Sequence, residues 1–143
     1  MKGSKVPWNL GVGTPLASLC RMTHARQDFG LRGEDLACEA LAARGYIVVA
    51  RRYRTRSGEL DIIARHRDYL VFIEVKARQS GSFGDPEEAV TLQKQQKMVW
   101  MANDYLTRNA LHEVPCRFDV VAISTESDPP LITIIEDAFR PGW

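Results

Sequence analysis

The chain has 143 residues, of which 45% are hydrophobic and 26% are charged, and its formal net charge is +1. A chain of this length and composition can bury one core but not two, so a single soluble domain is expected. A net charge this small excludes a nucleic-acid binder that works through bulk charge alone. No apolar stretch is long enough to span a membrane. The cysteines are odd in number and lack metal-ligand spacing, which favours reduced thiols in the cytoplasm: Cys20, Cys38 and Cys116.

Residues 1–28 look like an appendage to this domain. They mix Gly, Pro, Ser and Thr without periodicity, and Met22 would make an alternative start. We therefore expect residues 1–28 to be a flexible N-terminal extension, either disordered or upstream of the true start, and residues 29–143 to form the domain.

The first predicted element is a helix over Leu31 to Arg44, and Gly45 is a typical residue to end it. Its apolar residues recur at spacings of three and four: Leu31, Cys38, Leu41 and Ala42. Glu34 lies inside this apolar stripe. A buried carboxylate is costly unless it is paired or binds a metal, so Glu34 is a candidate site residue. The alternative is a first-turn glutamate that complements the helix dipole.

Three strands are predicted next, over Tyr46 to Arg54, Glu59 to Arg65 and Tyr69 to Ala77. The short polar segment between the second and third predicts an antiparallel hairpin, with His66 solvated at its turn.

Because side chains alternate along a strand, Leu60, Ile62 and Ala64 should share one face. Asp61 should share the other face of the hairpin with Glu74 and Lys76. Depending on the loop length, Asp61 lies opposite Phe72 or directly opposite Glu74, and in either register one divalent ion can bridge the two carboxylates.

Two unbridged carboxylates on a half-buried sheet would repel, and one would tend to stay protonated. A hard cation removes this conflict. Mg²⁺ or Mn²⁺ with oxygen ligands suits two carboxylates and a substrate phosphate better than Zn²⁺ does. Lys76 could stabilise charge on a reacting phosphate or help to polarise the attacking water. The alternative for this Glu-x-Lys pattern is a solvated strand edge.

A second helix begins either at Asp85, with Pro86 at its first position, or later at Thr91. Lys94 falls on its apolar stripe, where a lysine either extends to solvent or reaches an acidic cluster or a phosphate.

The last predicted strands are Arg117 to Ser124 and Leu131 to Glu136. Asp119, in the first of these, either pairs with Arg117 or a lysine, or supports the site. The order α-β-β-β-α-β-β predicts an α/β fold with one central mixed sheet flanked by helices.

Basic residues are concentrated between Arg44 and Arg78. Such a cluster either binds phosphates or protects a sheet edge from aggregation. The candidates for nucleic-acid contact are Arg52, Arg54, Arg56, Arg78 and Lys94.

Taken together, several segments resemble the YraN family of bacterial proteins, over about residues 30 to 123 and in consistent order. They are Gly33-Glu34, Gly58-Glu59-Leu60-Asp61-Ile62-Ile63, Val71-Phe72-Ile73-Glu74-Val75-Lys76-Ala77-Arg78, Phe83-Gly84, Lys94 and Arg117-Phe118-Asp119-Val120-Val121. That family is similar to the restriction-endonuclease-like, or PD-(D/E)xK, nucleases and to archaeal Holliday junction resolvases.

The resemblance implies a restriction-endonuclease-like fold and a site made of Glu34, Asp61, Glu74 and Lys76. In this site the three acids would hold the metal. The superfamily's Pro-Asp dipeptide is absent, because Asp61 follows Leu60.

The expected function is therefore that of a Mg²⁺- or Mn²⁺-dependent endonuclease that hydrolyses phosphodiester bonds in structured or branched DNA. A homodimer would suit a four-way junction. The alternatives are a nucleic-acid-binding module that kept the nuclease scaffold without turnover, and a purely structural assembly factor.

Overall fold

A computed structural model describes the backbone of residues 25–78 and 90–142, with side chains for 32–77 and 90–142. Its elements are α1 (Ala25–Ala43), β1 (Ile47–Thr55), β2 (Gly58–His66), β3 (Tyr69–Arg78), α2 (Leu92–Arg108), β4 (Cys116–Ser124) and β5 (Leu131–Phe139). The predicted order of one helix, three strands, one helix and two strands is confirmed. Neither of these helices is both long and apolar enough to cross a membrane.

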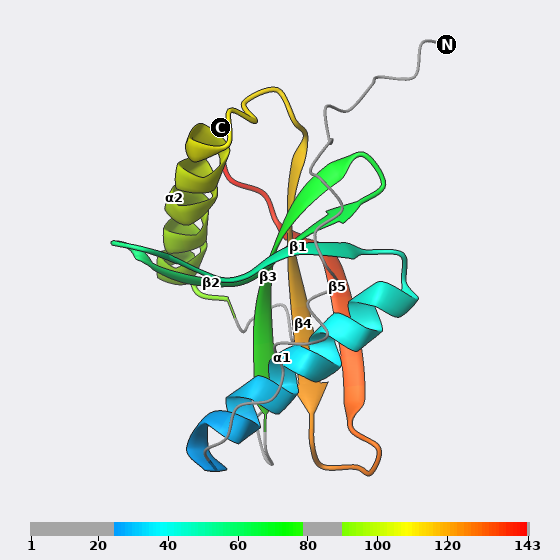
Figure 1. Ribbon diagram of the computed structural model, residues 1–143. Coiled ribbons are helices and arrows are strands. Elements are labelled where there is room, and N and C mark those ends of the chain that lie inside the picture. Colours follow the sequence, from blue (N-terminus) through cyan, green and yellow to red (C-terminus); the bar gives the residue numbers. More distant parts are fainter. Residues whose placement is uncertain (1–24, 79–89, 143) are drawn as a thin grey trace.

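The five strands form one open mixed sheet in the order β1-β2-β3-β4-β5. Neighbouring strands are antiparallel except for β3 and β4, which are parallel. A parallel pair needs a crossover connection, and α2 lies in the segment that connects β3 to β4. α1 lies across the strands β3 to β5, whereas α2 lies beside the curved β1–β2 hairpin (Figure 1).

The two helices cover two separate apolar clusters on the sheet. Because the helices pack on one mixed sheet, this is a mixed α/β fold. The cluster beneath α2 contains Phe72, Met98, Met101, Tyr105 and Phe118 among its buried members. The cluster beneath α1 contains Leu41, Ile62, Val71, Ile73 and Val121. β3 supplies both clusters with alternate side chains, so its polar residues are held in place by packing on both faces.

Both helices begin at positions that bear on the predictions. α1 begins at Ala25, ahead of the predicted Leu31 and inside the expected extension 1–28, whose remaining residues lie outside the described part of the chain. Glu34 is therefore in the third turn, and its interpretation as a first-turn residue is wrong.

α2 begins after Thr91, whose hydroxyl accepts a hydrogen bond from the Lys94 amide at 3.2 Å. The later of the two predicted starts is correct, and the region around Asp85 lies outside the described residues.

The β2–β3 pairing runs from His66↔Tyr69, across a two-residue turn, to Ile62↔Ile73. Beyond Ile62, β2 pairs with β1 alone, and the two strands curve toward α2 (Figure 1). Leu60 consequently packs in the cluster beneath α2, so the prediction that it shares a face with Ile62 is wrong. A Cβ atom at Gly58 would lie 3.6 Å from the Met101 sulfur, which shows how closely the hairpin approaches α2.

A buried polar network joins β4 to its neighbours. Asp119 is fully buried, and its carboxylate accepts two hydrogen bonds of 2.8 Å from the Arg117 guanidinium. It also accepts bonds from the Tyr46 hydroxyl at 2.8 Å and from the Asp137 amide at 2.9 Å. Of the predicted alternatives for Asp119, the structure shows the pairing with Arg117.

His66 belongs to the same network, and the prediction that it is solvated at a turn is wrong. It is only 5% exposed, and its ring stacks on Tyr46 with 3.9 Å between the ring centroids. Its Nδ1 lies 2.8 Å from Arg117 Nη2. Because a guanidinium can only donate, Nδ1 accepts and the ring proton sits on Nε2. Burial and the positive charge of Arg117 lower the pKa of His66.

Replacing Arg117 by Met should be strongly destabilising, because it leaves the Asp119 carboxylate buried without a cation. We expect the free energy of unfolding to fall by about 3 to 5 kcal/mol in urea titrations. The control is Arg140→Met, which removes an arginine that is 83% exposed and pairs with Asp137. That variant should leave the free energy of unfolding close to that of wild type. Equal, small losses in both variants would contradict a structural role for the network.

Candidate active site

Asp61 and Glu74 are brought together by the register of β2 and β3. They are the next residues on the two strands after the pair Ile62↔Ile73. The Asp61 side chain turns to β3 and accepts a hydrogen bond from the Val75 amide at 2.8 Å. The second of the two predicted registers, with Asp61 directly opposite Glu74, agrees with this geometry. The sequence tied that register to a four-residue loop, which is wrong, because the turn has two residues, Arg67 and Asp68.

The environment of Asp61 makes its charged form costly. Burial is the largest cause and the negative charge of Glu74 the next, and together they raise its pKa from an ordinary 3.8 to about 7. The hydrogen bond from Val75 acts in the opposite direction, and the charge of Glu34 adds a smaller increase. Asp61 is the one acid of this site for which the described residues provide no ion-pair partner. Near neutral pH its carboxyl is therefore only partly ionised, and a cation bound beside it would favour the charged form.

Glu74 is the most deeply buried acid of the site, with its side chain 6% exposed. Its Oε1 is approached by two ammonium groups, Lys94 Nζ at 3.3 Å and Lys76 Nζ at 3.5 Å. Its Oε2 is buried and has no hydrogen-bond partner among the described residues. A buried carboxylate oxygen without a partner is expensive, so this atom is suited to a ligand that the protein does not itself supply.

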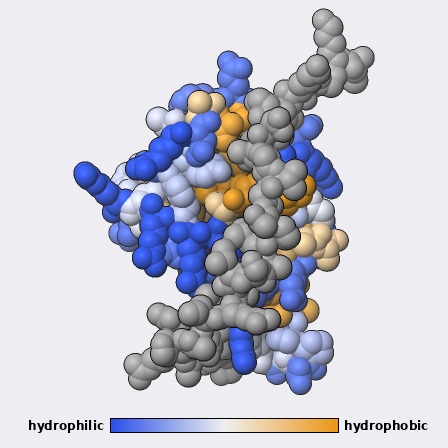
Figure 2. Space-filling view, viewed as in Figure 1, coloured by the Kyte–Doolittle hydropathy of each residue, from blue (hydrophilic) through white to orange (hydrophobic). Residues whose placement is uncertain are grey.

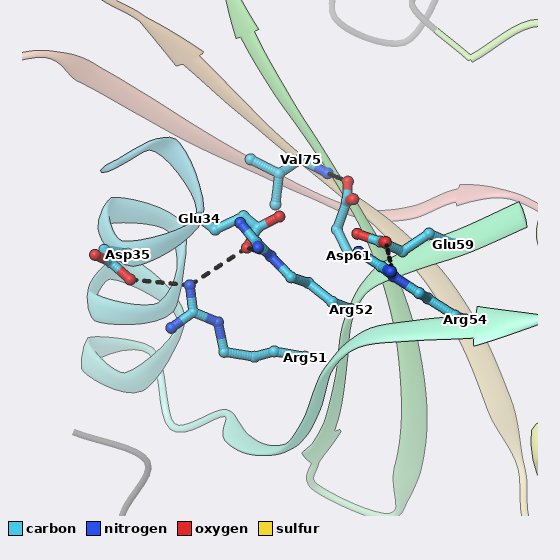
Figure 3. A network of polar contacts seen from close by, with 8 residues as sticks. All are labelled: Glu34, Asp35, Arg51, Arg52, Arg54, Glu59, Asp61 and Val75. Carbon is cyan, nitrogen blue, oxygen red and sulfur yellow. Dashed lines mark hydrogen bonds and ion pairs between the residues drawn. The ribbon is translucent and has the colours of Figure 1, made fainter. Parts of the chain in front are cut away.

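Glu34 reaches the same region from α1 (Figure 3). One carboxylate oxygen from each of Glu34, Glu59 and Asp61 lies within 4.8 Å of the other two. The sequence therefore predicted two of these three acids and missed Glu59, while the predicted Glu74 adjoins Asp61 but is not in this group. The signal was present, because Glu59 lies two residues before Asp61 on the same predicted face.

Three arginines of β1 contact Glu34 and Glu59, and in Figure 3 they lie on one side of these two acids. Arg52 Nε donates to Glu34 at 2.9 Å, and Arg51 Nη2 contacts the same oxygen at 3.4 Å. Arg54 Nε donates to Glu59 at 2.9 Å.

The other candidate basic residues have different positions. Lys94 reaches the acidic cluster, which is one of its predicted alternatives. Arg56 is exposed and forms no ion pair in the part of the chain with described side chains. Hydrophilic side chains gather at the left of Figure 2, where Figure 1 places the tip of the β1–β2 hairpin. The backbone of Arg78 ends β3, and its side chain lies outside the described residues.

The arrangement has the composition of a site for a hard divalent cation. Four carboxylates gather from α1, β2 and β3, and no histidine or cysteine is among them. Oxygen-only donors suit Mg²⁺ or Mn²⁺, and the orphaned Glu74 oxygen fits such an ion. Glu34, Glu59 and Asp61 could hold it together, with Glu74 adjacent to Asp61. The lysines beside Glu74 could act on a phosphate bound there.

The fold and this acidic centre thus define a mixed α/β protein with a candidate metal site on its sheet. Comparison with known proteins places it more closely. The model of the uncharacterised protein family UPF0102 matches residues 33–123, and the chain belongs to that family. The expected YraN membership is confirmed.

Its relatives match it over nearly their whole length. A UPF0102 protein of Desulforapulum autotrophicum is 44% identical over 119 residues, covering 83% of this chain and 98% of the relative. One from Lachnoclostridium phytofermentans is 48% identical over 111 residues, covering 77% and 91%. The matched region includes every acid of the site described above.

The raised pKa of Asp61 predicts a pH dependence of stability without divalent cations. An acid with a higher pKa in the folded state binds its proton more tightly when folded. Its contribution is therefore greatest below about pH 4 and is lost as the pH rises to about 7. Between pH 4 and pH 8 in EDTA, wild type should lose about 2 kcal/mol more than Asp61→Asn does, after allowance for partial solvent access.

Urea unfolding at several pH values measures this difference. Asp68→Asn is the control, because it removes an exposed acid at the turn of the same hairpin. Its pH profile should follow that of wild type. An Asp61→Asn profile parallel to wild type would contradict the raised pKa.

Proposed function

We propose that the protein is a metal-dependent phosphodiesterase that cuts nucleic acid, with DNA of structured or branched form as its substrate. The observation that carries the proposal is the buried Glu74 Oε2, which has no partner among the described residues and belongs to a carboxylate beside Asp61. Two acceptor groups in this position need a proton or a cation between them. Asp61 and Glu74 lie where a divalent ion could also meet a substrate phosphate.

Each residue has a separate role in this proposal. Asp61 and Glu74 bind the ion, and Glu34 completes or orients its ligand shell from α1. When bound, the ion supplies Lewis-acid activation of the phosphate and lowers the pKa of a coordinated water. Lys76, held 3.5 Å from Glu74, stabilises the negative charge that develops on the phosphate. Lys94 is held equally close to Glu74 and provides a second positive charge.

The superfamily, the phosphate-binding residues, the compartment and the oligomer are also part of the proposal. The element order α-β-β-β-α-β-β with a helix glutamate, a strand aspartate and a Glu-x-Lys pair supports membership of the PD-(D/E)xK superfamily. Arg52 and Arg54 lie on β1 and Arg56 lies in the turn after it, and all three could bind the phosphate backbone, as could Arg78. The thiol of Cys116, which forms no disulfide in the described structure, agrees with action in the cytoplasm. A homodimer would present two such sites to a four-way junction.

A second function is supported by a specific observation, the ion pairing within the site. Glu34, Glu59 and Glu74 each have a cationic partner in the described structure. A centre that is largely neutralised by its own side chains could persist as a nucleic-acid-binding module without turnover. That module would bind nucleic acid in a salt-sensitive manner and would need neither the metal nor Lys76.

Metal binding and cleavage distinguish the two functions. Wild type should bind Mn²⁺ saturably in calorimetry and cut at least one of a labelled four-way junction, a duplex and a single strand. Asp61→Ala and Glu74→Ala should lose this binding and the cleavage. Lys76→Ala should keep Mn²⁺ binding but cleave about 10² to 10³ times more slowly, because it removes charge stabilisation of the transition state.

The matched control is Glu39→Gln, which removes an exposed acid of α1 and should leave both properties unchanged. Circular dichroism must show that each variant is folded. Cleavage that persists in folded Asp61→Ala would refute the mechanism. Salt-sensitive binding without any Mn²⁺ binding or cleavage by wild type would establish the module instead.

A further inference from the structure

The backbone of β1 is irregular at Arg52, next to the acidic site. Arg52 has a φ of +53°, a left-handed conformation that is strained for a residue with a side chain. It lies between the pairs Arg51↔Ile62 and Tyr53↔Leu60, and is therefore beside Asp61. Strain of this kind at a site residue points to a constraint that the side chain satisfies.

The effect of this conformation is to direct two consecutive arginines to one oxygen. In a regular strand Arg51 and Arg52 would point to opposite faces of the sheet. Here Arg52 Nε and Arg51 Nη2 lie 2.9 Å and 3.4 Å from the same Oε2 of Glu34. Arg51 is also paired with Asp35 at 2.9 Å, so it is held on α1 independently of Glu34.

Arg52 differs from Arg51 in its access to solvent. Its side chain is 40% exposed, and that of Arg54 is 79% exposed, against 18% for Arg51. Arg52 and Arg54 each use Nε on a carboxylate of the group Glu34, Glu59 and Asp61. Both can therefore move away from the acids without leaving a cation buried.

A divalent ion among these carboxylates would compete with the two guanidiniums for the same oxygens. The ion would also repel both guanidiniums, and its double charge makes this repulsion twice that between two unit charges at the same distance. A phosphate that bridges the ion and the guanidiniums would remove the repulsion, because it is attracted to both. Arg52 and Arg54 are thus placed to exchange a carboxylate for a phosphate.

We propose that Arg52 and Arg54 are exchangeable counter-cations of the metal site. They neutralise Glu34 and Glu59 in the metal-free protein, and they transfer to substrate phosphates when a divalent cation occupies these acids. This inference rests on the proposed metal site and goes beyond it by coupling metal binding to nucleic-acid binding. Such coupling is reciprocal, so each ligand tightens the other.

The exchange predicts effects of opposite sign in the single variants Arg52→Gln and Arg54→Gln. Without nucleic acid, Mn²⁺ should bind each variant about 5- to 10-fold more tightly, because a competing cation is gone. With saturating Mn²⁺, in a Lys76→Ala background that slows cleavage, a labelled four-way DNA junction should bind each variant more weakly. The slope of log affinity against log salt should become shallower by about one contact.

Other roles give different combinations of these two measurements. Residues that only orient Glu34 and Glu59 would weaken Mn²⁺ binding when replaced. Residues that only bind phosphate would leave Mn²⁺ affinity unchanged. Weaker Mn²⁺ binding in both variants overturns the proposed exchange, and so does unchanged Mn²⁺ affinity in both. Unchanged binding of DNA also overturns it.

Two controls keep the result interpretable. Arg108→Gln removes the same charge from an arginine paired with Asp104 on α2, and it should change Mn²⁺ affinity by less than twofold. Arg52→Gly removes the guanidinium while relieving the left-handed strain, so it should be folded and should bind Mn²⁺ as tightly as Arg52→Gln. If wild type binds no Mn²⁺, both this inference and the metal site fail. If wild type binds Mn²⁺ and cleaves DNA but the opposed effects are missing, the exchange alone fails.

Discussion

The repulsion between Asp61 and Glu74 is the constraint around which the site is organised. The hairpin register sets these acids side by side, where burial raises the pKa of Asp61 to about 7 and leaves one Glu74 oxygen without a partner. Lys76 and Lys94 offset part of the negative charge, and the β1 arginines offset that of Glu34 and Glu59. Each of these positive groups offsets negative charge of the carboxylates. A divalent cation would neutralise the carboxylates more completely.

The sheet contains two buried polar centres, and their difference is informative. Around Asp119 every interaction is closed: Arg117, Tyr46 and a backbone amide satisfy the carboxylate, and His66 stacks against the network. Such a centre holds strands together and has no capacity left for a ligand. The Asp61 centre is incomplete by the same criteria, since it combines an orphaned oxygen with an acid that lacks a cation among the described residues. Incomplete satisfaction, rather than burial of charge itself, marks the functional candidate.

The β1–β2 hairpin connects the architecture to this chemistry. Its curvature toward α2 ends the β2–β3 ladder at Ile62, which frees the Asp61 side chain to accept a bond from the Val75 amide. The left-handed residue Arg52 then turns two successive arginines toward α1. A flat, regular hairpin would have presented these arginines to opposite faces, and Glu34 would have lost one of its two cations.

The sequence by itself determined the order of elements, because strand alternation, helical periodicity and turn residues are local properties. It marked Glu34 and Asp61 as separate candidates, and only the resemblance to a known family implied that they meet. It also placed Glu74 and Lys76 on one face of their strand. It could not find the burial of His66, the displacement of Leu60 to the other cluster or the part played by Glu59. These depend on how far the hairpin bends and on which strand lies beside which, and such long-range packing has no signature in a single segment. Only the tertiary structure decided that Lys94 reaches Glu74 and that the β1 arginines pair with the acids.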